Sequence, residues 1–73
     1  MTVPNEDIID YILMLINDFA EYVGLNELQA YLYLKNHNAI SFIENHYNIM
    51  HTLSEKDTME NLIVYCRKFG GSL

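Results

Sequence analysis

The sequence predicts an all-α fold: one small domain of four helices spanning residues 1–73. Three observations predict it. Apolar residues recur at the three- and four-residue spacing of amphipathic helices, no segment alternates as a strand would, and short polar or glycine-containing turns separate the helical segments. The chain has 73 residues, of which 51% are hydrophobic and 19% are charged. That composition is typical of a folded chain with one core.

The first helix is predicted from an N-cap at Asn5 to about Val23, with Gly24 in the left-handed position that ends it. At 100° per residue, its polar side chains form a stripe about 120° wide. The apolar arc that remains covers about 200°, roughly twice the width that a surface helix needs. We therefore expect this helix to be central in the fold, or to carry apolar surface that packs on another chain.

The second helix is predicted to open with a capping box formed by Asn26 and Gln29 and to end near Lys35 or Asn36. Tyr33 is expected to point away from most of its buried residues, which are predicted to be Leu28, Tyr31, Leu32 and Leu34. A polar turn then leads to a third helix, about Ala39–His51, whose predicted buried stripe is Ile40, Ile43, Tyr47 and Met50.

The fourth helix is predicted to follow a polar loop, Ser54–Asp57, and to begin with a capping box of Asp57 and Glu60. It should end near Phe69, where Gly70 and Gly71 stop it. Its predicted inner face consists of Met59, Leu62, Ile63 and Cys66.

The net charge of −6 is carried by the first half of the chain, because residues 1–34 hold six acids and no Lys or Arg. In residues 35–73 four acids and four bases cancel. Such a field repels phosphate backbones and favours basic partners. Nucleic-acid binding is therefore not expected, and the acidic surface is either a solvated face or a docking surface for a basic protein.

The sequence offers little for catalysis or for a metal or cofactor. The three histidines lack the i, i+4 spacing of a helical metal pair, and the single cysteine, Cys66, lies in an apolar stripe. A chain of this size has little room for a pocket, so we expect no enzyme activity. One cysteine and the absence of a long apolar run or a signal peptide favour a soluble cytoplasmic protein, with no membrane segment.

Tyr47 and His51 form an i, i+4 pair, followed by Thr52. We expect the histidine to bond a carbonyl at the end of its helix or the loop that follows, although a shared recognition spot is the alternative. Six tyrosines are more than so small a core can bury with their hydroxyls satisfied, which favours their use at helix edges or in an interface.

Several short motifs resemble DUF3791, a family of short bacterial proteins known only as a domain of unknown function. They are Ala30-Tyr31-Leu32-Tyr33-Leu34, Phe42-Ile43-Glu44-Asn45-His46-Tyr47, His51-Thr52-Leu53-Ser54 and Val64-Tyr65-Cys66-Arg67-Lys68-Phe69-Gly70-Gly71. The resemblance implies that Tyr47, His51 and Thr52 are characteristic positions. Before the third helix, this chain has Asn38 and Ala39 where the family pattern has a glycine, and asparagine tolerates the left-handed conformation. The resemblance implies no activity, but it does imply a neighbouring gene for an ADP-ribosyltransferase-like protein, as in a toxin–antitoxin or accessory-subunit pair.

Together these features predict a non-enzymatic, acidic protein–protein interaction module, antitoxin-like or accessory to such a neighbour. The predicted partner-binding residues are Asp10, Asp18, Glu21, Tyr33, Tyr47, His51 and Thr52. The alternative is a structural module that buries its surplus apolar surface in a homodimer.

Overall fold

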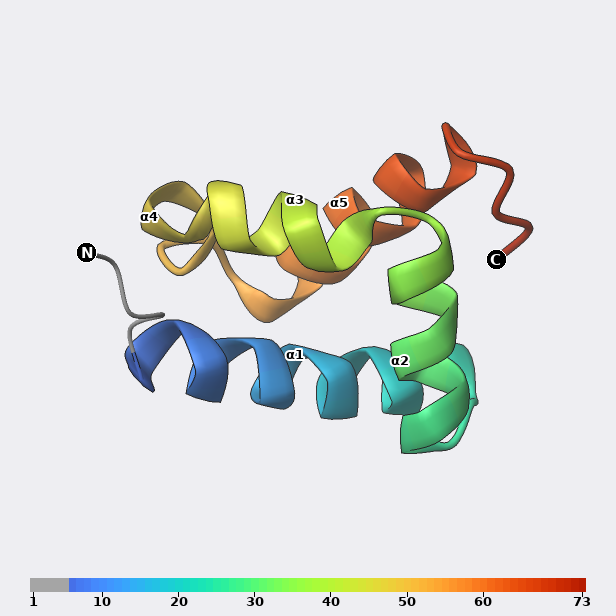
Figure 1. The fold of residues 1–73 in the computed structure, drawn as a ribbon, viewed down its shortest axis with the longest axis horizontal. Coiled ribbons are helices and arrows are strands. Elements are labelled where there is room, and N and C mark those ends of the chain that lie inside the picture. The colour runs from blue at the N-terminus through green and yellow to red at the C-terminus, as the bar shows by residue number, and fades with distance from the viewer. Residues whose placement is uncertain (1–5) are drawn as a thin grey trace.

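The computed structural model describes residues 6–73, so Asn5, the predicted N-cap of the first helix, lies outside the described residues. Within them all regular structure is helical, which confirms the all-α prediction. The helices are α1 (Glu6–Val23), α2 (Glu27–Asn36), α3 (Ala39–Asn45), α4 (Tyr47–Met50) and α5 (Glu55–Arg67) (Figure 1).

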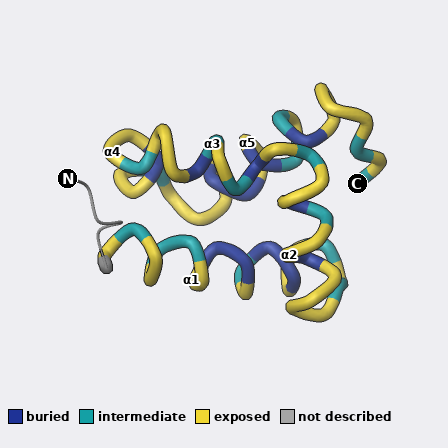
Figure 2. Tube along the Cα trace, viewed as in Figure 1, coloured by how far each residue is buried: buried dark blue, intermediate teal, exposed yellow. Residues whose placement is uncertain are grey.

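The helices form two layers joined at one end. α1 makes up one layer, α3, α4 and α5 make up the other, and α2 runs between them beyond the last turn of α1 (Figure 1). The buried segments lie where the two layers face each other, and α4 and the outer side of α2 are largely exposed (Figure 2). The fully buried large side chains are Phe19, Leu34, Ile43, Met59, Leu62 and Cys66. Met59, Leu62 and Cys66 confirm the predicted inner face of the last helix, and the fourth predicted residue, Ile63, is partly buried against this core.

The apolar arc of α1 is covered along its middle and open along its edges. Phe19 is fully buried, and Ile9, Leu13 and Tyr22 remain 44%, 60% and 47% exposed. The helix ends as predicted, since Gly24 has a φ of 78° and the Leu25 amide donates to the Ala20 carbonyl at 2.8 Å. The later helices therefore leave part of the apolar surface of α1 exposed. The sequence predicts such a surplus, because the apolar arc is wider than a surface helix needs.

The buried face of α2 differs from the predicted one. The capping box is confirmed: the Gln29 amide donates to Asn26 Oδ1 at 2.8 Å, and the Asn26 amide donates to Gln29 Oε1 at 3.0 Å. The helix nevertheless buries Ala30 and Leu34, and the predicted core residues Leu28, Tyr31 and Leu32 are exposed.

Tyr33 lies on the buried side of α2, with its ring stacked on Phe19 at 5.9 Å between centroids, whereas it was expected to point away. The physical reason is that α2 has apolar residues on two roughly opposite faces at 100° per residue. The face of α2 that carries the small side chain of Ala30 allows the helix to approach the core more closely. Periodicity alone cannot choose between two such faces.

The predicted third helix is divided into α3 and α4 at His46, where φ is −122°. Asn38, just before α3, has the left-handed φ of 64° that an asparagine tolerates. At the break, the His46 imidazole Nδ1 lies 2.9 Å from the Phe42 carbonyl, which also accepts the His46 amide at 3.0 Å. The side chain thus supplies a donor to a helix end, and residues 6–73 contain five helices where four were predicted.

All three histidines close helix ends in the same way. His37, His46 and His51 are the C-cap residues of α2, α3 and α4. Each Nδ1 lies 2.6–2.9 Å from the carbonyl oxygen four residues earlier, and each ring packs on the aromatic side chain of that residue. Because a carbonyl only accepts, each Nδ1 carries the hydrogen. The prediction that His51 bonds a terminal carbonyl is confirmed.

The last helix begins earlier than predicted. Its N-cap is Ser54, whose Oγ accepts the Asp57 amide at 3.1 Å, so Asp57 lies in the first turn and not at the cap. Ser54 fits this role because a short side-chain oxygen at the N-cap reaches the amide three residues on. An additional bond from Thr58 Oγ1 to the Ser54 carbonyl, at 2.9 Å, ties the two residues together.

After α5 the chain folds back on the helix it has left. Gly70 has a φ of 94°, and the Gly71 amide donates to the Cys66 carbonyl at 3.0 Å. The Leu73 amide then donates to the Tyr33 hydroxyl at 3.1 Å, and Arg67 Nε donates to the Leu73 carbonyl at 2.7 Å. These bonds hold the segment 70–73 against α2 and α5.

Candidate functional site

The exposed edges of α1 and α2 meet in a shallow groove of about 520 Å³. We call this the α1–α2 groove; its lining residues are Leu13, Ile16, Glu27, Leu28 and Tyr31. Leu28 is 66% exposed and Leu13 is 60% exposed, so the walls consist largely of apolar side chains that no described residue covers. Ile9, one turn before Leu13, extends the apolar edge of α1.

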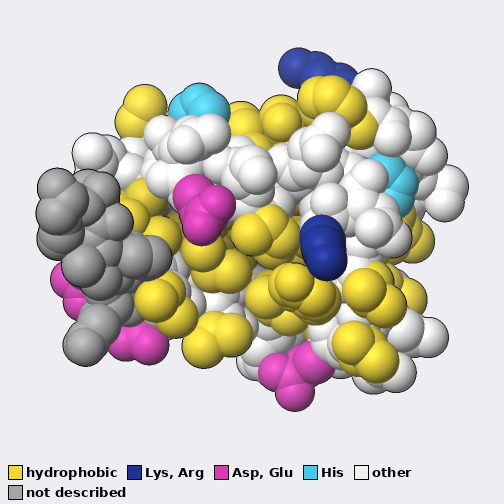
Figure 3. Space-filling view, in the orientation of Figure 1, with side chains coloured by type: hydrophobic (Ala, Val, Ile, Leu, Met, Phe, Trp, Pro, Cys, Tyr) yellow, Lys and Arg dark blue, Asp and Glu magenta, His cyan; other side chains and the backbone are white. Residues whose placement is uncertain are grey.

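The surface near the groove is acidic as well as apolar. Glu27 lines the groove itself, and Asp10 is an exposed residue one turn before Leu13 on α1. Where α1 and α2 lie, hydrophobic and acidic side chains both reach the surface (Figure 3). The arrangement is suited to a partner that offers apolar groups and positive charge together.

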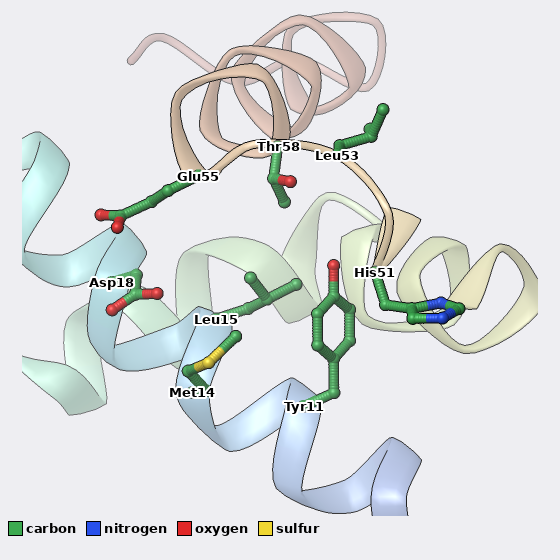
Figure 4. Close-up of a pocket in the computed structure, with 8 residues that line it drawn as sticks. All are labelled: Tyr11, Met14, Leu15, Asp18, His51, Leu53, Glu55 and Thr58. Carbon is green, nitrogen blue, oxygen red and sulfur yellow. The ribbon is translucent and has the colours of Figure 1, made fainter. Parts of the chain in front are cut away.

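A second hollow, of about 180 Å³, lies where α1 faces the end of α4 and the start of α5 (Figure 4). We call it the Tyr11 pocket; its lining residues are Tyr11, Met14, Leu15, Asp18, His51, Leu53, Glu55 and Thr58. The Tyr11 hydroxyl points toward Thr58, and the His51 ring is turned away from the other side chains (Figure 4). The volume of this pocket is smaller than that of most small-molecule binding sites, which is about 300–1,000 Å³.

Burial raises the pKa of Tyr11 above its usual value of 10, and the nearby Tyr47 adds to the increase, while a hydrogen bond with Thr58 opposes it. The Tyr11 and Tyr47 rings meet edge to face at 5.2 Å, and Tyr47 stacks on His51 at 4.7 Å. These ring contacts pack the N-terminal half of α1 against α4.

Cys66, the single thiol, is fully buried in the core, and burial raises its pKa to about 11. A nucleophilic cysteine needs the opposite, a depressed pKa and access to solvent. Among residues 6–73 no group of three His, Cys, Asp or Glu side chains lies close enough to hold a metal ion. In the same residues no helix is long and apolar enough to cross a bilayer.

The comparison with protein families gives a match that covers all five described helices. A family described as a protein of unknown function (DUF3791) matches residues 6–68. This chain belongs to the DUF3791 family. No curated protein and no solved structure matches it.

In this DUF3791 chain the predicted partner-binding residues fall into three places. Asp18 and His51 line the Tyr11 pocket, with Tyr47 and Thr52 beside His51, and the Thr52 hydroxyl donates to the Ile49 carbonyl at 2.6 Å. Asp10 and Glu21 are exposed on the polar stripe of α1. Tyr33 lies apart, half-buried and engaged with the tail.

The sequence predicts Leu28 and Tyr31, the apolar groove residues of α2, to lie in the core, so it does not reveal them as surface residues. The signal that could have found them is the doubled apolar pattern of α2, in which Leu28, Tyr31 and Leu32 oppose Ala30 and Leu34. A helix that is apolar on two faces has one face left over once it packs on a single core. Tyr11 and Thr58 of the pocket had no such signal, because their proximity depends on how α5 packs on α1.

Proposed function

We propose that this DUF3791 protein is a non-catalytic interaction module that binds another protein, in the manner of an antitoxin or an accessory subunit. The observation that carries the proposal is the α1–α2 groove. Single exposed apolar residues are ordinary on a protein surface, but a contiguous apolar patch with polar neighbours is typical of an interaction site. Here such residues come from two adjacent helices and share one groove.

A binding role accounts for the described surface better than a catalytic one. The Tyr11 pocket is small, burial moves the pKa of its phenol further above neutrality, and the thiol of Cys66 is inaccessible in the core. The three histidines each use Nδ1 to close a helix end. The groove, in contrast, offers apolar area for which the fold has no internal use.

The first partner to test is the product of the adjacent gene, since the family resemblance implies an ADP-ribosyltransferase-like neighbour. The two proteins would be expressed together with a tag on the neighbour alone. We expect a complex of defined stoichiometry in size-exclusion chromatography with light scattering, and a changed activity of the neighbour. If the chain elutes separately and the neighbour's activity is unaltered, the antitoxin or accessory role is wrong.

Self-association is the competing role, because a second copy of this chain would also bury the groove. Light scattering of the isolated protein at micromolar concentration separates the two. A monomer supports the binding of a different protein, and a tight dimer that Leu28→Ser dissociates supports a homodimeric structural module instead.

A further inference from the structure

We propose that the α1–α2 groove binds an amphipathic helix that carries Lys or Arg beside its apolar stripe. This inference rests on the proposed function and specifies the chemistry of the partner. It follows from three features of the groove: its backbone offers no free strand edge, its apolar side chains have helical spacing, and its border is acidic.

The groove offers a partner side chains but no row of free backbone groups. Both of its walls are helices, and apart from the first turn of α2 their amides and carbonyls are bonded within each helix. A bound strand would therefore gain no ladder of hydrogen bonds there, and those of its amides and carbonyls that the groove covered would lack partners. A helix satisfies its own backbone, so a helix is the form of partner that this groove accommodates.

The apolar residues of both walls are spaced to meet such a helix. Ile9 and Leu13 are four residues apart on α1, and Leu28 is followed by Tyr31 and Leu32, three and four residues later, on α2. All of them are more than a third exposed. Residues three and four apart form ridges on a helix surface, and ridges of a third helix fit between two such rows.

The charged residues at the groove determine which kind of partner helix is favoured. Glu27 lies in the groove and Asp10 beside its α1 wall, while residues 1–34 contain no Lys or Arg. The one base of α2, Lys35, has its Nζ over the Tyr31 ring, 5.9 Å from the centroid. Tyr31, the aromatic residue among those that line the groove, thus already has a cation over its ring, and Lys or Arg of a partner would be attracted by the carboxylates of Glu27 and Asp10.

The same charges disfavour a second copy of this chain as the occupant. In a two-fold symmetric contact the same surface of both copies comes together. Such a contact would bring Glu27 and Asp10 of both copies into one interface, and like charges in an interface oppose binding. A basic helix gains from these carboxylates, whereas a second copy does not.

The test uses two synthetic helical peptides and the intact protein. The peptides share one stripe of Leu at positions i, i+3, i+4 and i+7, and their flanking residues are all Lys in one and all Glu in the other. Binding is measured by fluorescence anisotropy at low salt. We expect the Lys peptide to bind at least about tenfold more tightly than the Glu peptide, and its affinity to fall as salt is added.

Matched variants locate the binding site. Leu13→Ser and Leu28→Ser remove apolar groups from the groove without changing the net charge, and Ile49→Ser removes one from α4, where Ile49 is 65% exposed. We expect each groove variant to weaken the Lys peptide by about tenfold and Ile49→Ser by less than about twofold. Glu27→Gln should weaken binding and reduce its dependence on salt.

Two results would overturn the inference. One is equal binding of the Lys and Glu peptides, or no binding of either. The other is equal affinity of the wild type and both groove variants, each shown to be folded by circular dichroism. Neither result decides the proposed function: a complex with the neighbouring gene product that survives Leu13→Ser and Leu28→Ser would leave the interaction role standing and place it on another surface.

Discussion

The choice of buried face on α2 can be tested by replacing two leucines of the same helix. Leu34 has no exposed surface, whereas Leu28 is 66% exposed. Truncating a fully buried leucine to alanine costs about 2–5 kcal/mol, because transfer free energy is lost and a cavity is left. Full burial of a leucine contributes about 1.5–3 kcal/mol, so the buried third of Leu28 corresponds to about 0.5–1 kcal/mol. Alanine's higher helix propensity offsets part of that smaller loss.

The assay is thermal and urea denaturation followed by circular dichroism at 222 nm, a wavelength that reports helix content. In a domain of this size, 1 kcal/mol shifts the melting temperature by about 4–8 °C. Leu34→Ala should therefore lower it by at least about 8 °C or unfold the protein, and Leu28→Ala by less than about 8 °C. A loss with Leu28→Ala as large as with Leu34→Ala would refute the assignment of the two faces, and with it the groove.

Three further predictions concern the ends of α5 and the core thiol. Gly71→Ala should destabilise the tail by about 1–3 kcal/mol, because the new Cβ would overlap the Tyr33 hydroxyl and lie 2.9 Å from the Cys66 carbonyl oxygen; a urea titration measures this loss. Ser54→Ala should cost about 0.5–2 kcal/mol by the same measurement, since it removes the N-cap. The free energy of unfolding should fall as the pH rises from about 9 to about 11, because the folded protein holds the Cys66 proton more tightly than the unfolded chain does. Denaturation followed across that pH range gives the slope.

Each of these has a control and an outcome that contradicts it. Ser72→Ala, next to Gly71 and exposed, should change little; a harmless Gly71→Ala would mean that the tail does not lie against Tyr33. Ser41→Ala, on the exposed side of α3, is the control for the N-cap, and a loss with Ser54→Ala no larger than with Ser41→Ala would contradict the capping role of Ser54. For the pH slope, Cys66→Ala should remove the contribution of the thiol, and an unchanged slope in that variant would contradict its assignment to Cys66.

Apart from the break at His46, the order and approximate bounds of the helical segments could be predicted, because their signals are local. Capping by Asn26 depends on a side chain and an amide three residues apart, and the left-handed positions at Gly24 and Asn38 depend on single residues. The buried face of the last helix was also predictable, since its apolar residues occupy one side. Such features need no knowledge of the rest of the fold.

The features of the fold that the sequence did not predict are those for which two local structures are both possible and the packing of the chain selects one. Ser54 and Asp57 are both good N-cap residues, and the helix begins at the earlier one, where the Thr58 hydroxyl also bonds the Ser54 carbonyl. α2 has two apolar faces, and only its packing on α1 selects between them. The break at His46 lies inside a continuous apolar stripe, so periodicity alone does not reveal it. The α1–α2 groove could not be predicted from sequence for the same reason, because it is formed by the apolar face of α2 that does not pack on the core.

The aromatic–histidine pairs have a consequence for how the short helices end. The hydrogen of each imidazole is engaged at Nδ1 by the carbonyl of the aromatic residue four positions earlier, and the imidazole packs on the ring of that same residue. One side chain therefore satisfies a terminal carbonyl and covers an aromatic ring at once. Between residues 37 and 51 the chain thereby ends three helices without a glycine, the residue that follows α1.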